Sequence, residues 1–280
     1  MKHLKLLLPG MKILLLILVI VYLIICAWFY INQEKLLFLE TKLPQAYTFP
    51  FQHPYEEVFV SSTDEARLHG LLFTADSARG VIYYLHGNGG DLSAWGEVAG
   101  LYTRLGFDVF MLDYRGYGKS EGTTQTEKQF FADAQAGYDY VKSRYQEDQI
   151  VVLGYSLGSA PASRLAADNH PRHLILQAPF YDIIDAARHI PHPVFKLTYL
   201  IPDFLFRFRL KNHEAVAKTQ VPITLFHGEE DITVYPGSAQ KLQAHFKPGD
   251  QVVMLPGVGH NDLTADPFYW QVMQDVFKRL

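Results

Sequence analysis

The sequence has a single cysteine and no long block of charge of either sign. That cysteine, Cys26, lies in an apolar run near the N-terminus, so the rest of the chain can form no internal disulfide, and cysteine usage does not indicate a redox compartment. Lys and Arg number 25 against 29 Asp and Glu, which gives a formal net charge of −4. Without a basic surface, we expect no nucleic-acid partner.

Internal repeats and low-complexity tracts are also missing, and the composition is that of a folded protein. The chain has 280 residues, of which 49% are hydrophobic and 19% are charged. This is enough to bury a full core, and the length fits one α/β domain with an appendage.

The appendage is an uncharged run of nineteen residues, Ile13–Ile31. As a helix it would span roughly 28 Å, which matches the hydrocarbon core of a membrane. Three lysines precede it, namely Lys2, Lys5 and Lys12. Glu34 and Lys35 follow it and roughly cancel, so the positive-inside rule predicts a cytoplasmic N-terminus and an extracytoplasmic body. In a Gram-negative bacterium this would mean the inner membrane and the periplasm.

Two processed forms are the alternatives to an uncleaved signal anchor. A cleaved signal peptide is disfavoured because the run exceeds the usual apolar region and no small-x-small cleavage site follows it. A lipoprotein processed at Cys26 is disfavoured because Leu23–Ile25 lacks the small residues such processing wants. We therefore predict a signal anchor in residues 1–35, a proline-containing connector in 36–57 and a catalytic domain in 58–280.

Strand-like and helix-like segments alternate through this domain. Apolar runs predict strands at Val58–Ser61, Leu68–Phe73, Val81–Leu85, Asp108–Leu112, Ile150–Leu153, Leu174–Leu176, Ile223–Phe226 and Gln251–Leu255. Helices are predicted at Lys128–Arg144, Ser238–Phe246 and Phe268–Leu280. The alternation predicts an eight-stranded, mostly parallel sheet with helices on both faces.

The segment Gly154–Gly158 reads Gly-Tyr-Ser-Leu-Gly directly after a predicted strand. This context is typical of a nucleophile elbow, a sharp turn that presents its serine, here Ser156, at the tip. Glycines two residues before and after the serine remove side chains that would collide. The N–H of Leu157 would point towards an oxyanion. A chance match in a glycine-containing turn is the alternative.

A second glycine-rich loop, His86–Gly90, follows the third predicted strand. Glycines after strands are common, but here they would expose N–H groups, and the N–H of Asn88 is the predicted second oxyanion donor. Substituting Asn88 with alanine keeps that N–H, so it should cost less than the roughly 10²–10³ in rate lost with a whole donor. We expect His86 to shape this loop and Arg115, in the next loop, to form ion pairs in the scaffold.

Asp231 and His260 each follow a late predicted strand. Open α/β sheets gather functional groups at the carboxyl ends of their strands, so Ser156, Asp231 and His260 can converge. The histidine would take the serine proton and pass it to the leaving group, while the aspartate fixes the imidazole tautomer. Asp182 and Asp185 are the fallback acids. His189 and His192 have a metal-compatible spacing, but two histidines make no complete site, so we expect no metal or other cofactor.

These motifs together resemble the α/β-hydrolase superfamily over about residues 58–280. The matching segments are His86–Gly90, Asp113–Gly118, Gly154–Gly158, Gly228–Asp231 and Gly259–His260. The resemblance implies an α/β-hydrolase fold with a short cap and a Ser156–Asp231–His260 triad. The anchor followed by Gln33–Phe38 is similar to small membrane-anchored α/β-hydrolase-domain proteins, whose characterised relatives act as serine esterases, thioesterases or lipid hydrolases. Because one fold hosts many reactions, it does not identify the substrate.

The predicted cap, about residues 181–217, is apolar and aromatic in its middle. Phe195, Tyr199 and Phe204 are candidates to line an acyl-chain site, although helices also need apolar faces merely to pack. We therefore expect a membrane-anchored serine hydrolase that cleaves small-molecule or lipid esters or thioesters through an acyl-enzyme. A peptidase or amidase of the same fold and a catalytically silent binding module remain the alternatives.

Overall fold

The sheet has the predicted eight strands, in a computed structural model that describes residues 2–280; Met1, the first residue of the predicted anchor, lies outside them. The strands are β1 (Tyr55–Ser61), β2 (Arg67–Phe73), β3 (Val81–Leu85), β4 (Asp108–Leu112), β5 (Ile150–Tyr155), β6 (His173–Gln177), β7 (Ile223–Gly228) and β8 (Gln251–Leu255). Their order is β1-β2-β4-β3-β5-β6-β7-β8. β2 pairs antiparallel with β1 and β4, and all other pairs are parallel.

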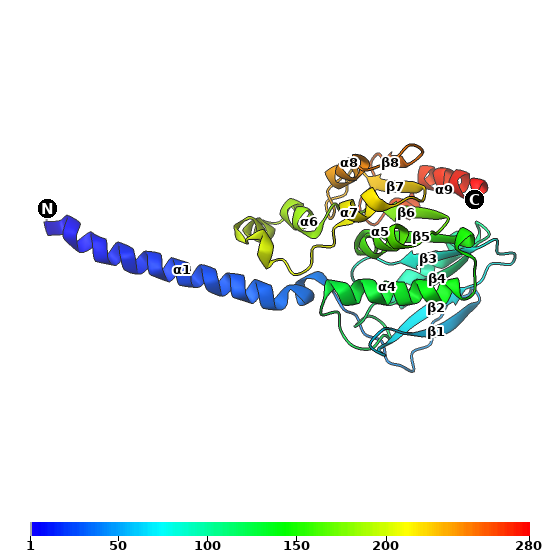
Figure 1. The fold of residues 1–280 in the computed structure, drawn as a ribbon, viewed down its shortest axis with the longest axis horizontal. Coiled ribbons are helices and arrows are strands. Elements are labelled where there is room, and N and C mark those ends of the chain that lie inside the picture. The colour runs from blue at the N-terminus through cyan, green and yellow to red at the C-terminus, as the bar shows by residue number, and fades with distance from the viewer. Residues whose placement is uncertain (1) are drawn as a thin grey trace.

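Helices cover both faces of this sheet (Figure 1). The α-helices of the body are α2 (Leu92–Trp95), α3 (Ala99–Thr103), α4 (Glu127–Lys142), α5 (Ser159–Asp168), α6 (Ile183–His189), α7 (Asn212–Lys218), α8 (Gly237–Gln243) and α9 (Pro267–Arg279). The 3₁₀ segments are η1 (Gly96–Val98), η2 (Glu147–Gln149), η3 (Ser156–Gly158), η4 (Pro193–Leu200), η5 (Asp203–Leu205) and η6 (Leu263–Ala265). The predicted fold class is therefore confirmed.

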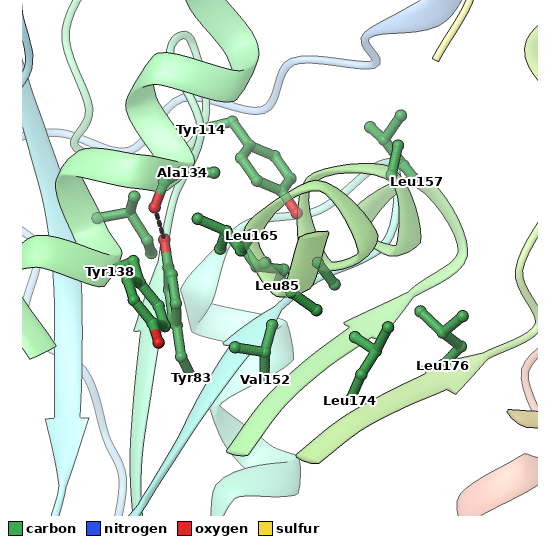
Figure 2. Close-up of a cluster of buried hydrophobic side chains, with 14 of the residues drawn as sticks. Tyr83, Leu85, Tyr114, Ala134, Tyr138, Val152, Leu157, Leu165, Leu174 and Leu176 are labelled. Carbon is green, nitrogen blue, oxygen red and sulfur yellow. Dashed lines mark hydrogen bonds between the residues drawn. The ribbon is translucent and has the colours of Figure 1, made fainter. Parts of the chain in front are cut away.

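The core has two halves because side chains alternate between the faces of a strand. Tyr83 and Leu85 of β3 pack in one half with α4, α5, α7 and α8, whereas Ile82 and Tyr84 pack in the other with α2, α3 and α9. Figure 2 shows the first half, in which the Tyr83 hydroxyl donates to the Ala134 carbonyl at 3.1 Å. This bond satisfies a polar group that is fully buried.

The N-terminal helix α1 (Lys2–Leu37) projects from the body (Figure 1). Within the described residues, its Gly10–Leu37 portion is the one helix long and apolar enough to cross a membrane. Its 28 residues correspond to roughly 42 Å. The chain then returns to the body, where the Leu43 N–H donates to the Gly118 carbonyl at 2.8 Å and Phe49 is buried. The connector is thus attached to the domain.

Candidate active site

The turn at Ser156 has the strained geometry of a nucleophile elbow. Ser156 directly follows β5 and begins η3 with a φ of 49°, a left-handed conformation that residues other than glycine rarely adopt. A Cβ at Gly154 would lie 2.5 Å from both the Cβ of Ala162 and the carbonyl oxygen of Gly158. A Cβ at Gly158 would collide with the Leu85 carbonyl oxygen. Both glycines are therefore needed for the turn.

Ser156, His260 and Asp231 form one chain of hydrogen bonds across three strand ends. The His260 Nε2 lies 3.1 Å from the Ser156 Oγ, and its Nδ1 lies 2.6 Å from the Asp231 Oδ2. A carboxylate only accepts, so in neutral His260 the proton belongs on Nδ1 and Nε2 is left to accept from the serine hydroxyl. This is the arrangement in which a histidine acts as a base towards serine.

Asp231 is buried but well supplied with donors. Its Oδ1 accepts the N–H groups of Thr233 and Val234, both at 2.8 Å, and the His227 Nε2 lies 3.2 Å from its Oδ2. Burial by itself would raise the pKa of Asp231, but the hydrogen bonds from His227 and His260 outweigh it and hold the pKa below its usual value. The carboxyl group is therefore ionised at neutral pH.

His227 contacts Asp231, and the sequence analysis did not predict this contact. It is fully buried at the end of β7, four residues before Asp231, and its Nε2 also donates to the Val234 carbonyl at 2.9 Å. Its position directly before Gly228, at a strand end and within reach of the predicted acid, was the available signal. A lone buried histidine has no pattern of its own that separates it from a core residue.

Asn88 lies beside the elbow because β3 and β5 are neighbours, with Leu85 opposite Gly154. Leu157, the other predicted oxyanion residue, is buried directly after Ser156.

The Asn88 side chain is bound on several sides. Its Nδ2 donates to the Leu37 carbonyl at 2.6 Å, and its Oδ1 accepts from Leu39 N at 3.0 Å, Gly89 N at 3.0 Å and the Tyr117 hydroxyl at 2.7 Å. The loop after β3 is therefore fastened to the end of α1, a link that no local pattern indicated.

Buried polar side chains pack around the base of the same loop. His86 and His69 flank Asp113, each with a ring nitrogen 3.5 Å from one of its carboxylate oxygens. The Tyr114 hydroxyl donates to the His86 carbonyl at 2.8 Å. His86 thus lies inside the scaffold of the loop. Arg115 also lies in the scaffold, where it pairs with Asp133 and Asp64.

Tyr155 is a second residue whose contact sequence reasoning missed. Its hydroxyl donates to the His260 carbonyl and lies 3.3 Å from the Asn261 Oδ1. The tyrosine ring also packs on the imidazole, with 5.5 Å between centroids. The residue next to the serine therefore fixes the loop that carries the histidine.

The remaining candidates lie outside this group. Phe195, Tyr199 and Phe204 are exposed, Phe204 to 82%, so they line no closed cavity. Asp182 caps α6, and His189 stacks on Tyr235 at 3.8 Å. Among residues 2–280, no group of three or more His, Cys, Asp or Glu side chains is arranged to hold a metal, and we assign no metal ligand.

Comparison with known proteins places the chain in a family. The model of the family described as "Serine aminopeptidase, S33" matches residues 76–217, which include Asn88 and Ser156 but end before Asp231 and His260. The chain is 29% identical over 252 residues to an uncharacterized protein of Mycobacterium tuberculosis, covering 89% of this chain and 86% of the relative. It is 27% identical over 212 residues to human alpha/beta hydrolase domain-containing protein 17B, covering 74% and 70%.

Two solved structures share the fold. An esterase of Pyrococcus furiosus matches with a TM-score of 0.68 and 20% identity, over 86% of this chain and 98% of that one. The acetyl xylan esterase of Paenibacillus sp. R4 matches with a TM-score of 0.65 and 17% identity, over 90% and 93%. At these identities the likeness concerns the fold alone.

Proposed function

We propose that this chain, which belongs to the serine aminopeptidase S33 family of the α/β-hydrolase superfamily, is a membrane-anchored serine hydrolase of carboxylic esters or thioesters. The observation that carries the proposal is the hydrogen-bonded chain from Ser156 through His260 to Asp231. A serine hydroxyl is a weak nucleophile until a neighbouring base removes its proton. His260 Nε2 stands where it can do so.

In the first half-reaction, the Ser156 Oγ would attack the carbonyl carbon of the substrate while its proton passes to His260 Nε2. The carbonyl electron pair moves onto oxygen, and the N–H groups of Asn88 and Leu157 would receive that oxyanion. When the pair returns, the bond to the alcohol or thiol breaks, and His260 gives its proton to the leaving group. An acyl-enzyme on Ser156 remains.

Water would then complete the reaction by the same route. His260 takes a proton from water as the water oxygen attacks the acyl carbonyl, and then returns that proton to the departing Ser156 Oγ. Asp231 keeps the imidazole in the correct tautomer and offsets its positive charge in both halves. The low pKa of Asp231 supports this role, because the carboxylate then remains ionised throughout the cycle.

The anchor part of the proposal is supported by α1. Its side chains from Ile13 to Ile25 are exposed, as expected of a helix that contacts lipid and does not pack in the protein core. The lysines before it favour a cytoplasmic N-terminus and an extracytoplasmic catalytic domain.

Labelling with a fluorophosphonate probe tests the enzyme directly. We expect the full-length protein in detergent to label, because the probe reacts with an activated serine, and Ser156→Ala to abolish labelling. Ser163→Ala is the matched control, since Ser163 is a buried serine on α5 that the proposed reaction does not use. Equal labelling of native protein and Ser156→Ala, or none in a folded native protein, would refute the proposal. Parallel assays with esters, thioesters and aminoacyl anilides separate an esterase from a peptidase.

A further inference from the structure

The tip of the cap, residues 193–206, packs along α1 rather than over the body alone. The Tyr22 hydroxyl donates to the Leu200 carbonyl at 2.9 Å. Further along the helix, the Gln33 side chain donates to the Leu205 carbonyl at 2.6 Å and accepts from the Arg207 N–H at 2.7 Å. The two contact points on α1 lie eleven residues apart, or roughly 16 Å along its axis.

Apolar packing fills the space between these hydrogen bonds. Cys26 of α1 is buried in a cluster with Ile184, Ile201 and Phe206. Phe29 meets the Phe206 ring edge-on, with 4.9 Å between centroids. Such burial of apolar side chains, together with satisfied backbone carbonyls, makes this a specific interface. Figure 1 shows the cap extending from the body in the same direction as α1.

This interface overlaps the proposed membrane span. The span covers residues 13–31 of α1, and the cap tip contacts the helix from Tyr22 onward. No lipid can lie between surfaces that are packed together, so an element packed on residues 22–31 must share their depth.

The cap tip exposes several large apolar side chains. Its exposed large side chains are Phe195, Leu197, Tyr199, Leu200 and Phe204. Large exposed apolar side chains concentrated in one short segment of a folded protein indicate an interaction surface. On α1, Trp28 and Tyr30 are also exposed, which suits the interface between membrane and water.

The charges in the tip are compatible with that environment. Asp203 is paired with Arg188 at 2.6 Å, and the Arg188 guanidinium lies 5.5 Å from the Tyr199 ring centroid. The other charged residue of the tip, Lys196, has a long side chain that can bring its ammonium group to the lipid headgroups.

We propose that the cap tip is a second membrane-embedded element, which enters the same leaflet as residues 22–31 of α1 and has the acyl chains of phospholipids as its partner. The inference rests on the membrane anchor of the proposed function. It goes further, because an anchor alone would leave the cap in water, whereas here the cap and α1 enter the bilayer as one packed unit.

The test measures depth with a fluorophore on full-length protein in phospholipid nanodiscs. The native thiol is removed by Cys26→Ala, and a nitrobenzoxadiazole label is attached to Phe204→Cys or, as a second cap position, Leu197→Cys. Ile17→Cys reports the anchor, and Ser77→Cys, in an exposed loop before β3, reports water. Thermal melting shows that each labelled protein is folded. Brominated lipid and aqueous iodide are the two quenchers.

We expect brominated lipid to quench residues 17, 197 and 204, while iodide quenches only residue 77. Quenching of residue 17 by lipid and of residues 204 and 197 by iodide would overturn the inference and leave the anchor intact. Protection of residues 204 and 197 from both quenchers would mean that protein covers the tip, which also overturns it. Quenching of residue 17 by iodide alone would refute the anchor and this inference together, without bearing on fluorophosphonate labelling.

Discussion

At the scale of single residues, the charge of Asp231 depends on its donors. Burial favours the neutral acid, but His227, His260 and two backbone N–H groups stabilise the carboxylate. Since the folded pKa lies below the ordinary value of 3.8, this contribution to stability is fully present above pH 3.8 and is lost as the pH falls further. His227, which is not part of the Ser156–His260–Asp231 chain, thus helps to keep Asp231 ionised.

Replacing His227 with leucine should weaken the fold at neutral pH. His227→Leu removes a hydrogen bond to a charged group, so we expect the free energy of unfolding at pH 7 to fall by about 2 kcal/mol. The difference in the free energy of unfolding between the variant and the native protein should decrease below pH 3.8, where the carboxylate contribution is lost. Urea unfolding at pH 7 and pH 3 measures both effects. The exposed His170→Leu is the control, and an equal loss in the two variants would contradict the assignment.

At the scale of elements, the loop after β3 depends on α1. Four hydrogen bonds hold the Asn88 side chain, and two of them reach Leu37, the last residue of α1, and Leu39, just after it. The backbone that we propose to bind the oxyanion is therefore positioned by a segment about fifty residues earlier in the sequence. Exchanging the Asn88 side chain changes that support without removing the backbone donor.

We expect Asn88→Ala to lower kcat about tenfold, less than the loss of a whole backbone donor but more than a surface change. The reason is loosened loop geometry, so KM should change less than kcat. Ester hydrolysis under saturating and limiting substrate separates the two parameters. Gln45→Ala is the matched control, because Gln45 also attaches the connector, through the Lys119 carbonyl, but does not touch this loop. Unchanged kcat in Asn88→Ala would show that the side chain does not position the loop.

Elements of this fold differ in how far sequence predicts them. The strands, the elbow at Ser156 and the positions of Asp231 and His260 follow from local patterns, because apolar runs and glycines act over a few residues. The sheet then brings strand ends together by topology. His227, Tyr155 and the Asn88 side chain make contacts that depend on packing between distant segments. The cap and α1 likewise meet through ordinary apolar residues, which carry no signal of their partner.

At the scale of the whole molecule, stability should depend on pH through His173. This histidine lies on β6, where its Nε2 is 2.9 Å from the Thr224 hydroxyl. Burial, helped by the charge of Arg279, lowers the pKa of His173 from 6.5 to about 4. Below pH 6.5, His173 is protonated in the unfolded chain but remains neutral in the folded protein. The free energy of unfolding therefore decreases as the pH falls from 6.5 to about 4.

We expect protonation of His173 in the unfolded chain to lower the free energy of unfolding by about 3 kcal/mol between those pH values. His173→Gln should flatten that part of the profile, because glutamine does not titrate, even if it lowers stability at pH 7. Urea unfolding at several pH values between 7 and 4 gives the slope. His170→Gln is the control for an exposed ring and should leave the slope unchanged. A native-like slope in His173→Gln would assign the acid sensitivity elsewhere.

The burial of Cys26 between α1 and the cap has a practical consequence. It is the single thiol of the chain, and it is covered by Ile201 and Phe206. A reagent that alkylates thiols can reach it only when the cap has separated from the helix. The rate at which Cys26 is alkylated in the unaltered protein therefore measures how often the cap separates from α1.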